Sequence, residues 1–93
     1  MSRDEGRALL TAHLARYRAH PYSRLAELVG SVETEDVRGT DGTIYQLEVE
    51  FFWDDKKNGD IRVLAALDGG GISAFRPMTD DFIKAPNGEY VGE

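Results

Sequence analysis

The chain has 93 residues, of which 41% are hydrophobic and 30% are charged, and its formal net charge is −6 at pH 7. This balance fits one small domain, residues 1–93, and argues against a disordered, collagen-like or coiled-coil chain. The absence of cysteine excludes a disulfide framework, a thiol nucleophile and a thiolate metal site. Because small secreted domains usually need disulfides, we expect a cytoplasmic protein. Neither a signal peptide nor a membrane span is expected, since no apolar run approaches the roughly 18 residues of a span.

Two helices are predicted in the first 30 residues. Ser2 followed by Glu5 is a capping-box pattern, and apolar residues recur behind it at helical spacing, which predicts a helix over 3–19. That apolar stripe contains Leu9, Leu10, Leu14 and Tyr17. His13 lies on the same stripe and is interpreted as a core residue with a satisfied ring nitrogen. A second helix is predicted over 24–29, with Ser23 as N-cap and Gly30 in the left-handed position after it.

After Gly30 the hydrophobic period changes from 3.6 to 2, which predicts antiparallel strands. The expected strands span 32–38, 43–53, 60–67 and 72–78, followed by a terminal hairpin over 82–91. Asp80 and Asp81 are interpreted as the first turn of a short helical segment. The expected fold class is therefore α+β: two N-terminal helices packed on one face of an antiparallel meander of about four strands. The face toward the helices should carry Tyr45, Leu47, Val49, Phe51, Ile61 and Val63.

Two segments carry a resemblance to a known group of domains. The first is the short helix that ends in Leu-Val-Gly, over 25–30, and the second is the Asp-Gly turn with its long aromatic strand, over 41–53. Together they resemble the two-helix-plus-meander domains of the SmpA/OmlA and β-lactamase-inhibitor-like group. The resemblance implies a protein-binding module. It does not imply an envelope location, because no export signal and no lipobox cysteine is recognised in the sequence.

No cofactor or metal is predicted. His13 and His20 are two helical turns apart, about 10.5 Å along the axis, which is too far for one metal ion. The loop over 54–60 resembles a calcium loop, but Lys56 and Ala65 occupy positions that must supply oxygen ligands. No catalytic residue is predicted either. Residues 31–93 hold 14 acids against six bases, and this acidic balance argues against nucleic-acid binding.

The candidate binding surface is the sheet face opposite the helices. Alternation places six residues on it: Gln46, Glu48, Glu50, Phe52, Arg62 and Leu64. Phe52 and Leu64 should form a dry centre inside a rim of glutamates, with Arg62 as a cross-strand neighbour of the glutamates.

This surface predicts a non-catalytic protein-binding module whose partner is a basic protein or a second copy of the chain in a homodimer. Two alternatives stay open. One is a small hydrolase that uses Glu48 and Glu50, which lie about 6.6 Å apart along their strand. The other is an acidic inhibitor or immunity-like protein that imitates nucleic-acid charge and blocks a basic enzyme.

Overall fold

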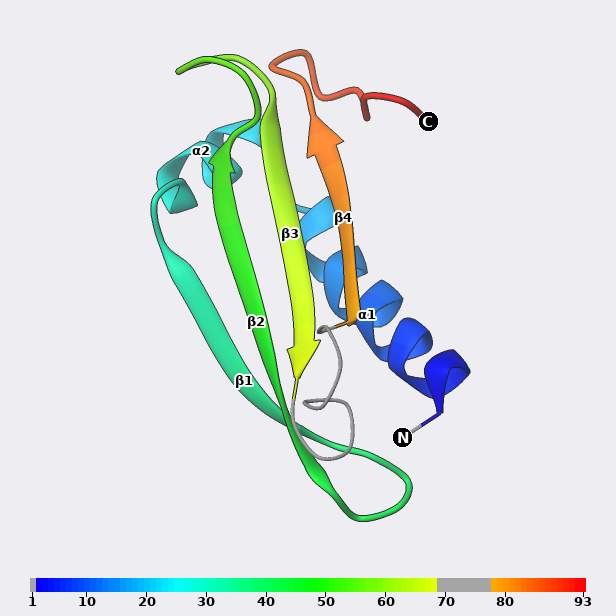
Figure 1. The fold of residues 1–93 in the computed structure, drawn as a ribbon. Helices are drawn as coiled ribbons and strands as arrows, with labels where there is room; N and C mark the ends of the chain where they lie inside the picture. Colours follow the sequence, from blue (N-terminus) through cyan, green and yellow to red (C-terminus); the bar gives the residue numbers. More distant parts are fainter. Residues whose placement is uncertain (1, 69–77) are drawn as a thin grey trace.

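The computed structural model describes residues 2–68 and 78–93 of the chain. These residues form two helices and one four-stranded antiparallel sheet, which confirms the predicted α+β class. The elements are α1 (Arg3–Arg18), α2 (Tyr22–Leu28), β1 (Val32–Arg38), β2 (Ile44–Trp53), β3 (Ile61–Asp68) and β4 (Met78–Lys84). The strands lie in chain order, so β1 and β4 form the two edges of the sheet, and both helices lie behind it in Figure 1.

One of the two hydrogen bonds of the predicted capping box is present at the start of helix α1. The Oγ of Ser2 accepts a hydrogen bond from the N–H of Glu5 at 3.1 Å, which satisfies one of the free donors of the first turn. The Glu5 carboxylate does not return to Ser2. It accepts the N–H of Thr40 at 2.9 Å instead and so ties the start of α1 to the turn between β1 and β2.

Helix α2 begins earlier than predicted, because Pro21 and not Ser23 is its N-cap. The backbone of Pro21 is extended, with φ −68° and ψ 159°, and its carbonyl accepts the N–H groups of Arg24 and Leu25. Ser23 therefore lies inside the first turn. Gly30 follows α2 with φ +90°, as predicted, and its N–H donates to the carbonyl of Phe51 at 2.9 Å.

The turn between β1 and β2 is fixed by Asp41. Its carboxylate accepts the N–H of Thr43 at 2.9 Å, and this hydrogen bond is the main cause that lowers the pKa of Asp41 to about 2. The Tyr45 hydroxyl donates to the same carboxylate at 3.1 Å. This Asx-type turn sets the register in which Val37 pairs with Tyr45.

The core lies between the helices and the sheet, with side chains from both in one cluster. Leu10, Leu14 and Leu25 are its fully or nearly fully buried helix residues. The sheet residues predicted to face the helices are all buried, which confirms the predicted parity: Tyr45, Leu47, Val49, Phe51, Ile61 and Val63. A slip of one residue would have put Glu48 and Glu50 in their place.

The fourth strand differs from the prediction. Apart from Met78, the strand expected over 72–78 lies outside the described residues, and β4 runs through Met78–Lys84. Asp80 and Asp81 are strand residues and not a helical turn, because β3 pairs with this segment from Met78 to Lys84. Cross-strand pairing thus outweighs the local preference of two consecutive acids for a helix start.

After β4 the chain turns back, and Tyr90 forms a single bridge with Lys84. The Lys84 side chain points toward the end of α1, where its Nζ donates to the carbonyls of His20 at 2.8 Å and Arg18 at 3.3 Å. The Arg18 guanidinium lies over the Phe82 and Tyr90 rings and forms two hydrogen bonds to Glu93, at 2.8 and 2.9 Å. The C-terminal segment therefore anchors the last turn of α1.

Candidate functional site

The sheet has a second face, here called the outer face, whose side chains alternate with those of the core. It consists of the even-numbered residues of β1, β2 and β3 and the odd-numbered residues of β4. All of these residues are exposed or half-buried. The structure brings the six predicted site residues together here: Gln46, Glu48, Glu50, Phe52, Arg62 and Leu64. Their role in binding stays a prediction.

Sequence reasoning missed the outer-face residues on the two edge strands. Val32 lies opposite Glu50 on β1, and Asp81 lies opposite Leu64 on β4. The alternation of β1 could have placed Val32, because its range was predicted. Asp81 could not be placed, since its segment was assigned to a helical turn.

Apolar side chains gather at one end of the outer face rather than at its centre. Arg62 on β3 lies between Phe52 on β2 and Ile83 on β4, and Leu64 follows two residues further along β3. All three apolar side chains are half-buried. Glu48 and Glu50 lie beside the apolar group, along β2. The dry centre with a rim of glutamates stays a prediction. More exposed apolar side chains lie on β1 and β2, where Val32 is 53% and Ile44 is 48% exposed.

Arg62 is held by two carboxylates. Its Nε and Nη2 lie 2.8 Å from one carboxylate oxygen of Asp54, and its Nη1 donates to Asp81. The hydrogen bond to Asp54 is the main cause that raises the pKa of Arg62. Arg62 was predicted to be a cross-strand neighbour of the glutamates. The register places Phe52 directly opposite Arg62 and leaves Glu50 diagonal to it, and the ion-pair partners of Arg62 are Asp54 and Asp81.

The outer face is acidic. It carries five carboxylates against two guanidinium groups: Asp36, Glu48, Glu50, Asp68 and Asp81 against Arg38 and Arg62. Because Arg62 is already paired with Asp54 and Asp81, it offers little positive charge to a partner. A cationic surface is therefore the electrostatic complement of this face.

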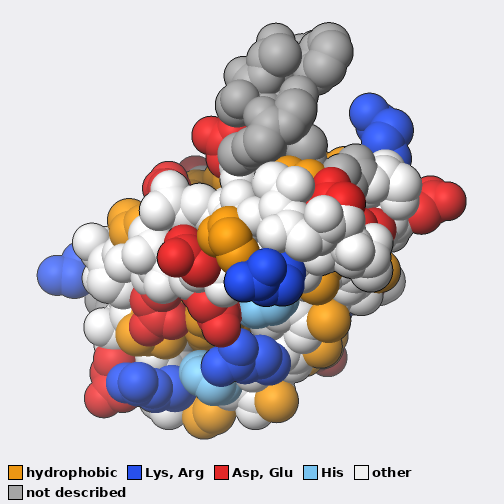
Figure 2. Space-filling model, turned by 90° about the horizontal axis from the view of Figure 1, so that it is seen from below, with side chains coloured by type: hydrophobic (Ala, Val, Ile, Leu, Met, Phe, Trp, Pro, Cys, Tyr) orange, Lys and Arg blue, Asp and Glu red, His pale blue; other side chains and the backbone are white. Residues whose placement is uncertain are grey.

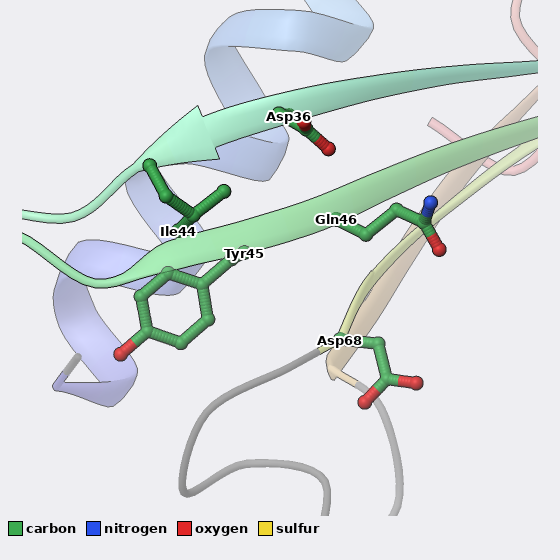
Figure 3. Close-up of a pocket in the computed structure, with 5 residues that line it drawn as sticks. All are labelled: Asp36, Ile44, Tyr45, Gln46 and Asp68. Atoms are coloured by element: carbon green, nitrogen blue, oxygen red, sulfur yellow. The ribbon is translucent and has the colours of Figure 1, made fainter.

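One shallow hollow of about 200 Å³ lies near the end of the outer face that adjoins the turn between β1 and β2. Its lining residues are Asp36, Ile44, Tyr45, Gln46 and Asp68. Figure 3 shows Asp36 and Gln46 extending from the neighbouring strands β1 and β2, with Asp68 at the end of β3 and the Tyr45 ring directed away from them. Glu48 and Glu50 do not line this hollow, so it gives no support to the hydrolase alternative.

Within residues 2–68 and 78–93, no group of three or more histidine, aspartate or glutamate side chains could hold a metal ion. None of the helices in the described part of the chain is long and apolar enough to cross a membrane. No protein-family model, no curated protein and no solved structure matches the chain. The resemblance to the SmpA/OmlA and β-lactamase-inhibitor-like group therefore stays a prediction.

Proposed function

We propose that the protein binds another protein through the outer face of its sheet, while the two helices cover the opposite face, and that it is not itself a catalyst. The exposure of Val32 beside Phe52 and Leu64 carries this proposal. Val32 is 53% exposed and lies opposite Glu50, which in turn lies opposite Leu64 and two residues before Phe52, so these three apolar side chains share one region of the outer face. Ile44, which is 48% exposed, lies apart from them, opposite Arg38. A contiguous exposed apolar patch on a small domain is typical of an interaction surface.

The charge of the outer face favours a basic partner over a second copy of the chain. A two-fold dimer through this face would bring two acidic surfaces together, and like charges across an interface are destabilising. A partner with lysine and arginine side chains would pair with Asp36, Glu48 and Glu50 while its apolar side chains contact Phe52. A basic enzyme blocked by this face, the inhibitor alternative, is one case of such a partner.

The experiment compares Phe52→Ala with Val91→Ala as immobilised baits for proteins from the cells that produce the chain. Val91 is the matched control, because it is apolar and 42% exposed but lies after β4, outside the sheet strands. We expect partners bound by the wild type to be retained by Val91→Ala and to bind Phe52→Ala at least about fivefold more weakly, as expected for an aromatic residue that contributes strongly to an interface. Thermal unfolding should show that both variants are folded.

A second pair of variants tests the charge of the partner. Glu48→Gln combined with Glu50→Gln should weaken binding and reduce its dependence on salt, because the surface attraction is electrostatic. Glu89→Gln is the control, since Glu89 is also exposed but belongs to the turn after β4. Equal recovery by the wild type and Phe52→Ala would contradict binding by this face. Sedimentation of the wild type as a dimer that Phe52→Ala dissociates would instead assign the face to self-association.

A further inference from the structure

Arg62 lies at the apolar end of the outer face, and two carboxylates fix its orientation there. Its Nε and Nη2 lie 2.8 Å from one carboxylate oxygen of Asp54, and its Nη1 donates to Asp81. Asp54 follows β2 and Asp81 belongs to β4, so the guanidinium group is held from both sides of β3. The N–H groups of a guanidinium lie in its plane, so these contacts use its edges and leave its flat faces without a hydrogen bond.

The cross-strand neighbours of Arg62 are apolar. Phe52 lies opposite it on β2, and Ile83 lies opposite it on β4. The Arg62 side chain is 33% exposed, so it can be reached from solvent and therefore by a partner. In residues 2–68 and 78–93, two aromatic rings lie over the Arg18 guanidinium, but none lies over that of Arg62. Any ring that stacks on Arg62 must therefore come from outside this part of the chain.

Arg18 shows how the same chain completes an arginine that is held by a carboxylate. Its guanidinium forms two hydrogen bonds to Glu93, at 2.8 and 2.9 Å. At the same time its Cζ lies over two rings, 4.9 Å from the centre of Phe82 and 4.8 Å from the centre of Tyr90. Hydrogen bonding and stacking are compatible, because one uses the edges of the guanidinium and the other uses its faces. Arg62 has the carboxylates of this arrangement without the rings.

We propose that Arg62 is a specificity-determining residue of the outer face, and that it binds an aromatic side chain of the partner by stacking. This inference rests on the proposed function, because it names the side chain that the basic partner places on the apolar end of this face. The bound ring also contacts Phe52 and Ile83, while lysine or arginine side chains beside it in the partner pair with Glu48 and Glu50. Arginine and aromatic residues are enriched among the side chains that contribute most to interfaces.

A carboxylate is the other side chain that an arginine commonly binds, and the outer face disfavours a carboxylate from the partner. The charge of Arg62 is already balanced by Asp54 and Asp81. Glu50 lies diagonal to Arg62 across β2 and β3. A partner carboxylate would add a fourth negative charge to this group, and like charges across an interface are unfavourable. An aromatic ring adds no charge and buries apolar surface against Phe52, so it is the better complement.

Titration of the ¹⁵N-labelled protein with two capped tripeptides, Lys-Trp-Lys and Lys-Leu-Lys, tests the stacking directly by NMR. The two peptides carry the same charge and differ in the aromatic ring. We expect Lys-Trp-Lys to bind about three- to fivefold more tightly than Lys-Leu-Lys, the range of a partly exposed cation–π contact. The ring current of the bound tryptophan should also shift the Nε–H signal of Arg62 upfield, which Lys-Leu-Lys cannot do.

Arg62→Lys is the variant, since it keeps the positive charge beside Asp54 and Asp81 but removes the planar group. The preference for Lys-Trp-Lys should fall below about twofold in this variant, because the stacking surface is lost. A control for ion-paired cations in general is needed, because Figure 2 shows Lys or Arg side chains next to Asp or Glu side chains at several places on the surface. Arg24→Lys is that control and should keep the preference, since Arg24 lies on α2 and its Nη1 is 3.4 Å from the carboxylate of Glu27.

Equal binding of the two peptides by the wild type would overturn the inference. So would a preference for Lys-Trp-Lys that Arg62→Lys leaves unchanged, or binding of Lys-Trp-Lys without a shift of the Arg62 Nε–H signal. That shift is measured on the wild type, so it does not depend on the folding of a variant. The proposed function fails separately, if partners from the cells are recovered equally by the wild type and Phe52→Ala. Partners that require Phe52 but are recovered equally by the wild type and Arg62→Lys would overturn the stacking alone and leave the proposed function standing.

Discussion

Replacing Lys84 with methionine tests whether a buried ammonium group holds the end of α1 in place. Lys84 is 8% exposed, and its Nζ donates to the carbonyls of His20 at 2.8 Å and Arg18 at 3.3 Å. Carbonyls in the last turn of a helix have no partner inside the helix, and their negative end of the dipole favours a cation. Lys84→Met keeps the length and the apolar stem of the side chain but removes both hydrogen bonds.

The expected loss follows from these two contacts. A hydrogen bond to a charged group contributes about 1.5–3 kcal/mol, but desolvation of the ammonium offsets part of it. The Tyr90 hydroxyl also donates to the Arg18 carbonyl, at 2.8 Å, so that carbonyl keeps a donor in Lys84→Met. The His20 carbonyl loses the donor that Lys84 provides. We therefore expect Lys84→Met to lower the free energy of unfolding by about 2 kcal/mol.

Urea unfolding of the wild type, Lys84→Met, Tyr90→Phe and the double variant, followed by circular dichroism, measures this loss. Because Lys84 and Tyr90 donate to the same carbonyl, the two changes should not be additive, with a coupling of about 0.5–1 kcal/mol. A Lys84→Met variant as stable as the wild type, or more stable, would refute the reasoning. It would show that the cost of desolvating the ammonium group equals or exceeds the gain from its hydrogen bonds.

Two further predictions concern the core and the seam between α1 and β1. Val49→Ala should lower the free energy of unfolding by about 2–4 kcal/mol, and Glu48→Ala should lower it by less than about 0.5 kcal/mol. Urea unfolding of both variants measures these losses. The opposite order would contradict the assignment of Val49 to the core face and Glu48 to the outer face. Burial and the hydrogen bond to Glu33 raise the pKa of Tyr17 to about 12 from its usual 10.0. The stability that this shift contributes is complete below pH 10 and is lost as pH rises toward 12. The free energy of unfolding of Tyr17→Phe should therefore decrease less with pH over that interval than that of the wild type.

The fold could be predicted where the hydrophobic period is long and regular. In β2 the alternation covers the whole strand, and a wrong register would have buried two glutamates, so Val49 and its neighbours could be assigned to the core. The fourth strand could not be predicted from its own residues. Its segment contains Thr79, Asp80 and Asp81, which locally favour a helix start, and it becomes a strand because β3 offers a partner along its full length.

The candidate site was predictable only in part, for a similar reason. Alternation placed Phe52 and Leu64 on one face, but the neighbours of a side chain across the sheet depend on the register between strands. That register depends on the turns, so the sequence did not show that Arg62 lies beside Asp81 and away from Glu48. The contact of His13 with Glu35 was equally out of reach, since it joins residues 22 positions apart on two different elements.

The edge strand β1 adds an argument for binding through the face of the sheet. An exposed edge offers unpaired backbone groups to a second strand, and charged side chains that point inward are a common protection against such pairing. Glu33 and Glu35 point to the core side of β1 and are engaged by Tyr17 and His13. A partner strand added at β1 would have to pack against these charged groups, where apolar contact is unfavourable. The outer face carries carboxylates as well, but beside them Val32, Phe52 and Leu64 present apolar surface that a partner can cover.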